Sequence, residues 1–274
     1  MVKIKNILVS QPKPETEKSP YLELAKKYGL KMDFRPFIHV EGVPAQEFRK
    51  DRINILDHPG VIFTSRNAVD HFFRMCTEMR LTVPEGMKYF CMSESTAYYL
   101  QKYVVYRKRK IFYGKQTIED LMPLLKKYKD ERYLLPCSDI LKDEIPQALS
   151  THKVRYTKAI LYRTICSDLS DLANVNYDML VFFSPSGIKS LFKNFPDFKQ
   201  NKTKIAAFGP TTARAVEQHG LQMDVHAPTP VAPSMTMAIE NFIRQAEGEM
   251  NGNQRKGLLK KMSLKKNLFK KKKK

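Results

Sequence analysis

Two similar segments, about 120 residues apart, contain the hydroxyl groups that are best placed by their spacing to bind a ligand. The run Val61–Phe63 leads into Thr64 and Ser65, and the run Leu180–Phe183 leads into Ser184, Pro185 and Ser186. Each apolar run is typical of a buried parallel strand, and a helical pattern follows it. A loop between such a strand and a helix N-terminus attracts anions through free N–H groups. The two segments therefore predict two α/β domains facing one cleft.

A third loop joins the strand predicted at Lys204–Phe208 to the helix predicted at Thr211–His219. Gly209 allows close approach of the backbone to a ligand, and Thr211 or Thr212 is placed to cap the helix while the open N–H groups bind a carboxylate. Capping alone explains these threonines equally well, and it also explains the serines of the Leu180 segment. No Gly-x-Ser-x-Gly motif and no Ser–His–acid set is present. We therefore interpret the hydroxyls as donors to an anion and not as nucleophiles.

Other residues whose side chains could bind a ligand or take part in catalysis are isolated in the sequence. Lys204 and Arg66 flank candidate loops and have the charge to pair with carboxylates, although solvation is the default for both. Tyr162 lies near the end of a predicted strand, where packing is the commonest role of a tyrosine. The four cysteines and six histidines lack the spacing of metal ligands. We therefore expect no metal site, and reduced thiols as in the cytoplasm.

The basic charge is concentrated at the C-terminus. The 274 residues include 48 lysines and arginines against 28 acidic residues, which gives a net charge of +20. Residues 250–274 contain eleven of the cations and no acid, so residues 247–274 are predicted to form a disordered polybasic tail. Apolar residues between its lysines leave open a weak contact with an anionic membrane or with nucleic acid. No apolar run reaches the length of a membrane span, and the N-terminus shows no signal-peptide pattern.

Strands alternate with helices over residues 4–246, which predicts parallel sheets with helices on both faces. The predicted strands are Ile4–Ser10, Lys31–Ile38, Gly60–Thr64, Lys88–Met92, Ile111–Tyr113, Arg132–Pro136, Tyr156–Thr164, Met179–Ser184, Lys204–Phe208 and Met223–Ala227. The predicted helices are Pro20–Tyr28, Pro44–Leu56, Asn67–Met79, Ser95–Lys102, Thr117–Tyr128, Asp143–Ser150, Gly187–Phe195, Thr211–His219 and Ser234–Ala246.

The order of these motifs resembles the uroporphyrinogen-III synthase family. The most specific part is the pairing of Phe182–Gly187 with Phe208–Ala215. The matching segments, in chain order, are Phe63–Ser65, Ser95–Ala97, Leu134–Ser138, Ile145–Leu149 and Leu161–Thr164. The resemblance covers roughly residues 4–246 and leaves the tail out. Two positions depart from the family pattern: Gln11-Pro12 stands where members often have Arg-Pro, and Glu94 lies in a loop that often contains glycine.

The resemblance implies a fold of two α/β domains with parallel sheets flanked by helices, joined by a two-stranded linker, with a cleft between them. The first domain would be discontinuous, residues 1–38 plus 164–246, and residues 41–160 would form the inserted second domain. The connecting segments would lie near Phe37–Glu41 and Ile160–Thr164. The residues agree with this arrangement, because the first two strands alone are too few for a stable domain and the last third can complete their sheet.

The resemblance also implies an enzyme that cyclises hydroxymethylbilane, a linear tetrapyrrole with eight carboxylates, with loss of water and inversion of ring D through a spiro intermediate. It implies a monomer that uses no metal and no cofactor, with Tyr162 assisting departure of the hydroxyl. The implied substrate-binding residues are Thr64, Ser65, Thr96, Ser184, Ser186, Gly187, Lys204, Thr211 and Thr212. A non-catalytic anion-binding or nucleic-acid-binding α/β protein with a basic tail stays open as the alternative.

Overall fold

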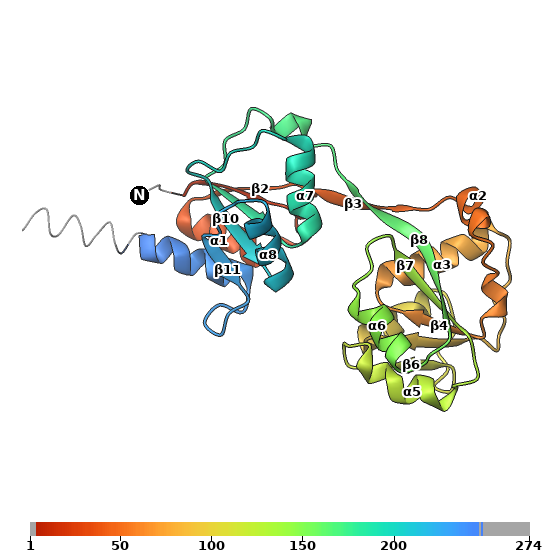
Figure 1. Ribbon diagram of the computed structural model, residues 1–274. Coiled ribbons are helices and arrows are strands. Elements are labelled where there is room, and N and C mark those ends of the chain that lie inside the picture. The colour runs from red at the N-terminus through yellow and green to blue at the C-terminus, as the bar shows by residue number, and fades with distance from the viewer. Residues whose placement is uncertain (1–3, 247, 249–274) are drawn as a thin grey trace, which may run out of the picture. The chain divides into compact units, whose positions relative to one another are not determined.

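A computed structural model describes residues 4–246 and 248 (Figure 1). The chain divides into two compact units: unit 1 comprises Met1–His39 and Cys166–Lys274, and unit 2 comprises Val40–Ile165. The predicted ranges for the two domains were 1–38 plus 164–246, and 41–160. The tail predicted at 247–274 lies outside the described residues except for position 248. No helix in the described part of the chain combines the length and apolar character needed to cross a membrane.

Unit 1 is built on a five-stranded sheet in the order β11-β10-β9-β1-β2. Its strands are β1 (Asn6–Val9), β2 (Lys31–Phe34), β9 (Met179–Phe182), β10 (Lys204–Phe208) and β11 (Val225–Ala227). All neighbouring strands are parallel. Because β9 pairs with β1, the last third of the chain completes the sheet that β1 and β2 begin.

Helices cover both faces of this sheet. They are α1 (Pro20–Tyr28), α7 (Pro185–Asn194), α8 (Pro210–Gln218) and a helix over residues 235–246, and a 3₁₀ turn, η5, spans Ser170–Leu172. Side chains alternate between the faces along β1. Ile7 and Val9 pack with α1 and the helix 235–246, whereas Leu8 packs with α7 and α8.

Unit 2 contains a six-stranded sheet in the order β3-β8-β7-β4-β5-β6. Its strands are β3 (Ile38–Gly42), β4 (Gly60–Phe63), β5 (Lys88–Cys91), β6 (Ile111–Tyr113), β7 (Tyr133–Ser138) and β8 (Tyr156–Cys166). The strands β4 to β8 are parallel. The chain passes between the two units in β3 and β8 (Figure 1), which are hydrogen-bonded to each other. They run antiparallel, because Val43 bonds to Leu161 while the earlier Phe37 bonds to the later Ser167.

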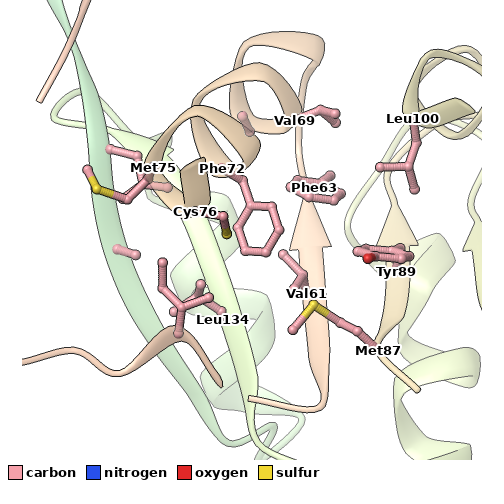
Figure 2. Close-up of a cluster of buried hydrophobic side chains, with 14 of the residues drawn as sticks. Val61, Phe63, Val69, Phe72, Met75, Cys76, Met87, Tyr89, Leu100 and Leu134 are labelled. Carbon is pink, nitrogen blue, oxygen red and sulfur yellow. The ribbon is translucent and has the colours of Figure 1, made fainter. Parts of the chain in front are cut away.

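The α-helices of unit 2 are α2 (Ala45–Phe48), α3 (Arg66–Glu78), α4 (Glu94–Tyr99), α5 (Met122–Lys127) and α6 (Glu144–Thr151). Its 3₁₀ turns are η1 (Arg49–Asp51), η2 (Ile55–Asp57), η3 (Leu100–Lys102) and η4 (Glu119–Leu121). Figure 2 shows Phe72 of α3 pointing at Phe63 of β4, and the two rings meet edge to face with centroids 5.5 Å apart. The other face of the sheet packs against α5 and α6.

The architecture confirms the predicted α/β class, with parallel sheets flanked by helices. Two predicted elements are wrong in their continuity. The helix predicted at Pro44–Leu56 breaks into α2 and two 3₁₀ turns, because Arg52 adopts a left-handed φ of 55°. The strand predicted at Lys31–Ile38 ends at Phe34. Pro36 has no N–H for a ladder, and Phe37 turns inward to meet Phe182, with ring centroids 5.6 Å apart.

The predicted helix Thr117–Tyr128 starts later than expected. The segment begins as η4, and the α-helical part begins only at Met122. Pro123 in the first turn of α5 has no N–H to continue an upstream helix. Thr117 still accepts a hydrogen bond from the backbone N–H of Asp120, over 3.4 Å.

Candidate active site

Each sheet has a point where the strand order reverses, and open α/β sheets bind ligands outside the carboxyl ends of the strands at that point. In unit 1 the reversal lies between β1 and β9, and in unit 2 it lies between β4 and β7. Ser184 is the second residue after β9, and Ser65 is the second residue after β4. The two similar segments of the sequence therefore place one serine at each reversal point.

Serine side chains cap α3, α7 and α4, which begin at these edges. Ser65 Oγ accepts the N–H of Ala68 over 3.2 Å, and Ser184 Oγ accepts the N–H of Gly187 over 3.2 Å. Both serines thus cap a helix. A serine oxygen that accepts one bond can still donate its own hydrogen. Capping therefore does not remove either hydroxyl from ligand binding.

The third cap is Ser93, at the start of α4, and the sequence interpretation missed it. Ser93 Oγ accepts the N–H of Thr96 over 3.3 Å and lies 3.0 Å from Thr96 Oγ1. Thr96, a predicted site residue, is consequently buried against its own helix cap, with 4% of its surface exposed. A serine two residues after an apolar strand was the available signal, since Ser65 and Ser184 occupy the same position.

The N-terminus of α8 differs because no side chain caps it. Its N-cap residue is Gly209, with φ of 84°, and Pro210 occupies the first turn. The expectation that Thr211 or Thr212 caps this helix is therefore wrong. Thr211 is exposed, whereas Thr212 is buried, with 1% of its surface exposed. An uncapped helix start with a glycine lead is suited to an anion, because backbone N–H groups and the helix dipole are both available.

Gly187 and Ser186 lie in the first turn of α7 at the edge of the same sheet. A Cβ at position 187 would lie 3.4 Å from the ring of Phe182 and 3.8 Å from Ser10 Oγ. The buried Gly187 thus brings the start of α7 close to the end of β1, while Ser186 is half-buried. Gln11, the departure from the family pattern, is half-buried in the loop that follows.

A β-bulge sets the direction of Tyr162 in unit 2. Cys137 pairs with Ile160, but the next residue of β7, Ser138, pairs with Tyr162. Leu161 is therefore an extra residue, and both Leu161 and Tyr162 join the core on the α3 side. Bulges of this kind redirect a side chain. As a result the phenolic oxygen of Tyr162 lies 3.4 Å from Ser65 Oγ.

Burial controls the protonation of this phenol. Tyr162 is 7% exposed, and desolvation raises its pKa above the ordinary value near 10, while the bond to Ser65 acts in the opposite direction. The phenol is therefore protonated at neutral pH and able to donate its hydrogen. Thr64, the other predicted site residue in the loop after β4, precedes Ser65 in the sequence and is half-buried.

The structure does not bring Lys204 to the other predicted site residues. Lys204 begins β10, so it lies at the opposite edge of the sheet from Gly209. Its Nζ is 2.8 Å from the carboxylate of Asp224, whose side chain is 7% exposed. The sequence could not reveal this pair, since the two residues come together only through the parallel pairing of β10 and β11.

Arg66 and Glu94 also have local partners. The guanidinium of Arg66 lies over the ring of Tyr99, 5.5 Å from its centroid. Glu94 accepts a hydrogen bond from the hydroxyl of Tyr113 over 3.2 Å and lies in the first turn of α4, where an acidic side chain complements the helix dipole. A helix-stabilising role thus accounts for the acidic residue at this position.

A cavity of about 870 Å³ lies elsewhere in unit 1. Its lining includes Asp178 and Thr203, which directly precede β9 and β10. It therefore opens at the amino ends of the strands and not at the edge that carries Ser184. Among residues 4–246 and 248, no three His, Cys, Asp or Glu side chains are grouped to hold a metal ion.

Comparison with known proteins identifies relatives over most of the chain. A family model described as "Uroporphyrinogen-III synthase HemD" matches residues 19–237. Uroporphyrinogen-III synthase from Chlorobaculum parvum is 24% identical over 257 residues, covering 88% of this chain and all of the relative. The enzyme of that name from Saccharomyces cerevisiae is 27% identical over 143 residues, which are 46% of this chain and 51% of the yeast protein.

Two solved structures share the fold. The Helicobacter pylori uroporphyrinogen-III synthetase aligns with a TM-score of 0.59 at 18% identity, covering 88% of this chain and 100% of that chain. A mutant uroporphyrinogen III synthase from Thermus thermophilus aligns with a TM-score of 0.55 at 19% identity, covering 89% and 99%. Since the family match spans both units of the fold, this chain belongs to the uroporphyrinogen-III synthase family.

Proposed function

We propose that this protein cyclises hydroxymethylbilane to uroporphyrinogen III. Family membership over residues 19–237 supports this activity. The observation that carries the residue assignment is the 3.4 Å approach of the Tyr162 phenol to Ser65, at the point where the strand order of unit 2 reverses. A protonated phenol beside a hydroxyl-lined loop fits a reaction whose first need is the departure of a hydroxyl group.

The substrate carboxylates would be held by hydroxyl and N–H donors of the strand-to-helix loops. The open start of α8, with Gly209 and the exposed Thr211, supports one such contact, since it offers uncapped N–H groups. The further contacts proposed are the hydroxyls of Thr64, Ser65, Ser184 and Ser186. Gly187 would act by bringing the α7 turn close to Ser10. The buried Thr96 and Thr212 would support their loops, and Lys204 is left out because Asp224 occupies it.

In the proposed reaction, Tyr162 donates its phenolic hydrogen to the terminal hydroxyl oxygen of the substrate. The bond between that oxygen and the terminal carbon breaks, and the oxygen leaves as water. The substituted α-carbon of ring D then bonds to the terminal carbon, which gives the spiro intermediate. The bond from this α-carbon to its original methylene bridge breaks and re-forms at the free α-carbon of ring D, which inverts the ring and closes the macrocycle. The closing step releases a proton from ring D, so the phenolate can be reprotonated and no net acid is consumed. The raised pKa of Tyr162 favours the donor form that the first step needs.

A coupled assay with freshly generated hydroxymethylbilane tests the proposal. The type III isomer, scored against the spontaneous type I isomer after oxidation, should predominate. Tyr162→Phe should lower kcat by about 10²-fold, in the range lost with a general acid. Tyr156→Phe is the matched control, because Tyr156 lies at the other end of β8, opposite Tyr133. Type I product alone at high protein concentration would refute the activity and leave non-catalytic anion binding.

We further propose that the protein acts as a monomer in the cytoplasm, and that the polybasic tail makes only weak contact with an anionic membrane or nucleic acid. Four unpaired cysteines, Cys76, Cys91, Cys137 and Cys166, support a reducing compartment. Light scattering should give the mass of one chain. Truncation after Ala246 should leave kcat unchanged and abolish salt-sensitive binding to anionic vesicles or RNA. A loss of kcat on truncation would contradict the assignment of activity to the two units.

A further inference from the structure

A histidine on α3 lies against the ring of Tyr162. The imidazole of His71 stacks on the phenol ring with centroids 4.8 Å apart and planes 18° apart. Ser65, which caps the same helix, contacts the hydroxyl of that phenol. One helix therefore meets Tyr162 at two points, the hydroxyl and the ring face. Stacked rings of this kind have a preferred offset and orientation, so the contact restricts where the phenol can point.

Arg74, one turn further along α3, fixes the state of the imidazole. Its Nε–H donates to Nδ1 of His71 over 3.1 Å. A guanidinium has only donors, so Nδ1 of His71 must be the acceptor. The ring hydrogen of the neutral imidazole is therefore on Nε2. Arg74 thus holds both the tautomer and the rotation of the ring that stacks on Tyr162.

Arg74 is also bonded to the bulge that directs Tyr162. Its Nη2 donates to the carbonyl of Leu161, the extra residue of β8, and to the carbonyl of Val43 on the neighbouring segment, both over 2.9 Å. Its Nη1 pairs with Glu78 over 2.5 Å. Room for the guanidinium depends on Gly42, because a Cβ there would lie 2.6 Å from Arg74 Cζ. The same side chain therefore joins the backbone before Tyr162 to the imidazole that faces its ring.

The charges around His71 favour a neutral ring. Burial lowers its pKa below the ordinary value, and the positive charge of Arg74 lowers it further, while the carboxylates of Asp70 and Glu78 act in the opposite direction. Asp70 is already occupied, since it accepts hydrogen bonds from the hydroxyls of Tyr99 and Tyr103. Neutrality matters because a cation on the face of a phenol ring would favour the phenolate. A neutral His71 leaves Tyr162 protonated.

We propose that His71, held by Arg74, is a positioning residue that aims the phenol of Tyr162 at the leaving hydroxyl of the substrate. His71 acts through Tyr162 and is not itself assigned a contact with the substrate. The proposal rests on the role of Tyr162 proposed above.

Three variants on one helix separate this role from a general effect on folding. His71→Leu removes the stacked ring, and His71→Phe restores an aromatic ring without the nitrogen atoms. Phe73→Leu is the matched control, because Phe73 lies on the same helix and its ring stacks on Tyr103, with centroids 4.5 Å apart. We expect His71→Leu to lower kcat about tenfold with KM within about twofold, because misplacement of an acid affects the chemical step. His71→Phe should recover most of kcat, and Phe73→Leu should keep it.

The environment of Tyr162 gives a readout that does not depend on turnover. In protein labelled with ¹³C at the tyrosine ζ carbon, the signal of Tyr162 is identified by its loss in Tyr162→Phe. His71→Leu should move this signal and change its titration midpoint, and Phe73→Leu should not. An unchanged Tyr162 signal in His71→Leu would overturn the proposal. So would an equal loss of kcat in Phe73→Leu.

A double-mutant cycle distinguishes the failure of each proposal. If His71 acts through the phenol, adding His71→Leu to Tyr162→Phe should cost no further activity. A full additional tenfold loss in that background would show that His71 acts independently, which overturns the positioning role. If Tyr162→Phe alone keeps wild-type kcat, the proposed role of Tyr162 fails, and the ¹³C signal then decides whether His71 positions the ring.

Discussion

At the scale of single residues, Ser65 combines two functions in one hydroxyl group. It caps α3 through the N–H of Ala68, and it lies within hydrogen-bond distance of Tyr162. The cap is a local effect that the sequence could predict, because a serine between an apolar strand and an amphipathic helix is a standard N-cap signal. The contact with Tyr162 joins residues 97 positions apart, so only the folded sheet reveals it.

Replacing Ser65 by alanine should affect stability and turnover separately. The free energy of unfolding should fall by about 1 kcal/mol, because the cap is lost. Ser234→Ala should cost a similar amount, since Ser234 accepts the N–H of Met237 over 3.2 Å at the start of the helix 235–246. Urea unfolding and kcat measured on both variants check this. Only Ser65→Ala should lower kcat. Equal kcat in the two variants would exclude a role for the Ser65 hydroxyl in turnover.

At the scale of elements, α8 has two glycines with positive φ, one at each end. Gly209 has φ of 84° and Gly220 has φ of 69°, and neither has a neighbouring atom within 4 Å of an added Cβ. Gly209, with ψ of 153°, lies in an extended region at positive φ that is open almost only to glycine, so a side chain is strained there without meeting a steric clash. Only the Gly209 end presents the uncapped N–H groups that we assign to a substrate carboxylate.

The glycine at the other end of the helix provides a control for a test of the α8 N-terminus. Gly220→Ala should reduce the free energy of unfolding by ~1–2 kcal/mol, the cost of a positive φ, and Gly209→Ala should reduce it by at least as much, because its backbone conformation is open almost only to glycine. Gly209→Ala should also raise KM severalfold, because the helix start must change its direction. Gly220→Ala should leave KM unchanged. If steady-state kinetics gave the same KM for both variants, the open N-terminus would have no part in substrate binding.

The strands and the loops after them were predictable from the sequence. The break in one predicted helix and the bulge in β8 were not. Apolar runs such as Val61–Phe63 and Met179–Phe182 are marked by hydrophobic character alone. The break of the helix predicted at Pro44–Leu56 depends on the left-handed Arg52, which no local pattern indicates. The bulge at Leu161 likewise depends on pairing with β7, a partner that the order of residues does not specify.

At the scale of the whole molecule, the two units have separate hydrophobic cores. The clusters of unit 2 contain only residues between Val43 and Tyr162, and those of unit 1 contain only residues up to Phe37 or after Cys166. Phe72 lies at the centre of one unit 2 cluster, as Figure 2 shows. A defect in one core therefore removes no packing partner from the other.

Core truncations should consequently act within one unit. Phe72→Ala should cost ~3–5 kcal/mol, the usual range for a buried phenylalanine, and should accelerate amide hydrogen exchange in α3, β4 and β5. Exchange in β9 and β10 should stay at the wild-type rate. Leu180→Ala in β9 is the reciprocal control and should accelerate exchange only in unit 1. Uniform acceleration over both units in either variant would show that they unfold as one cooperative body.

The bulge in β8 has a consequence for comparing distant relatives of this chain. Leu161 and Tyr162 occupy the space of one residue in the pairing with β7. A homologue with a regular strand would present its tyrosine to the same helix from one position earlier. Ungapped alignment across this strand would then equate Tyr162 with the wrong residue and report the phenol as missing. Near 20% identity, the counterpart of Tyr162 should be identified by superposing the residue opposite Ser138, and a single-residue gap at this site should carry little penalty.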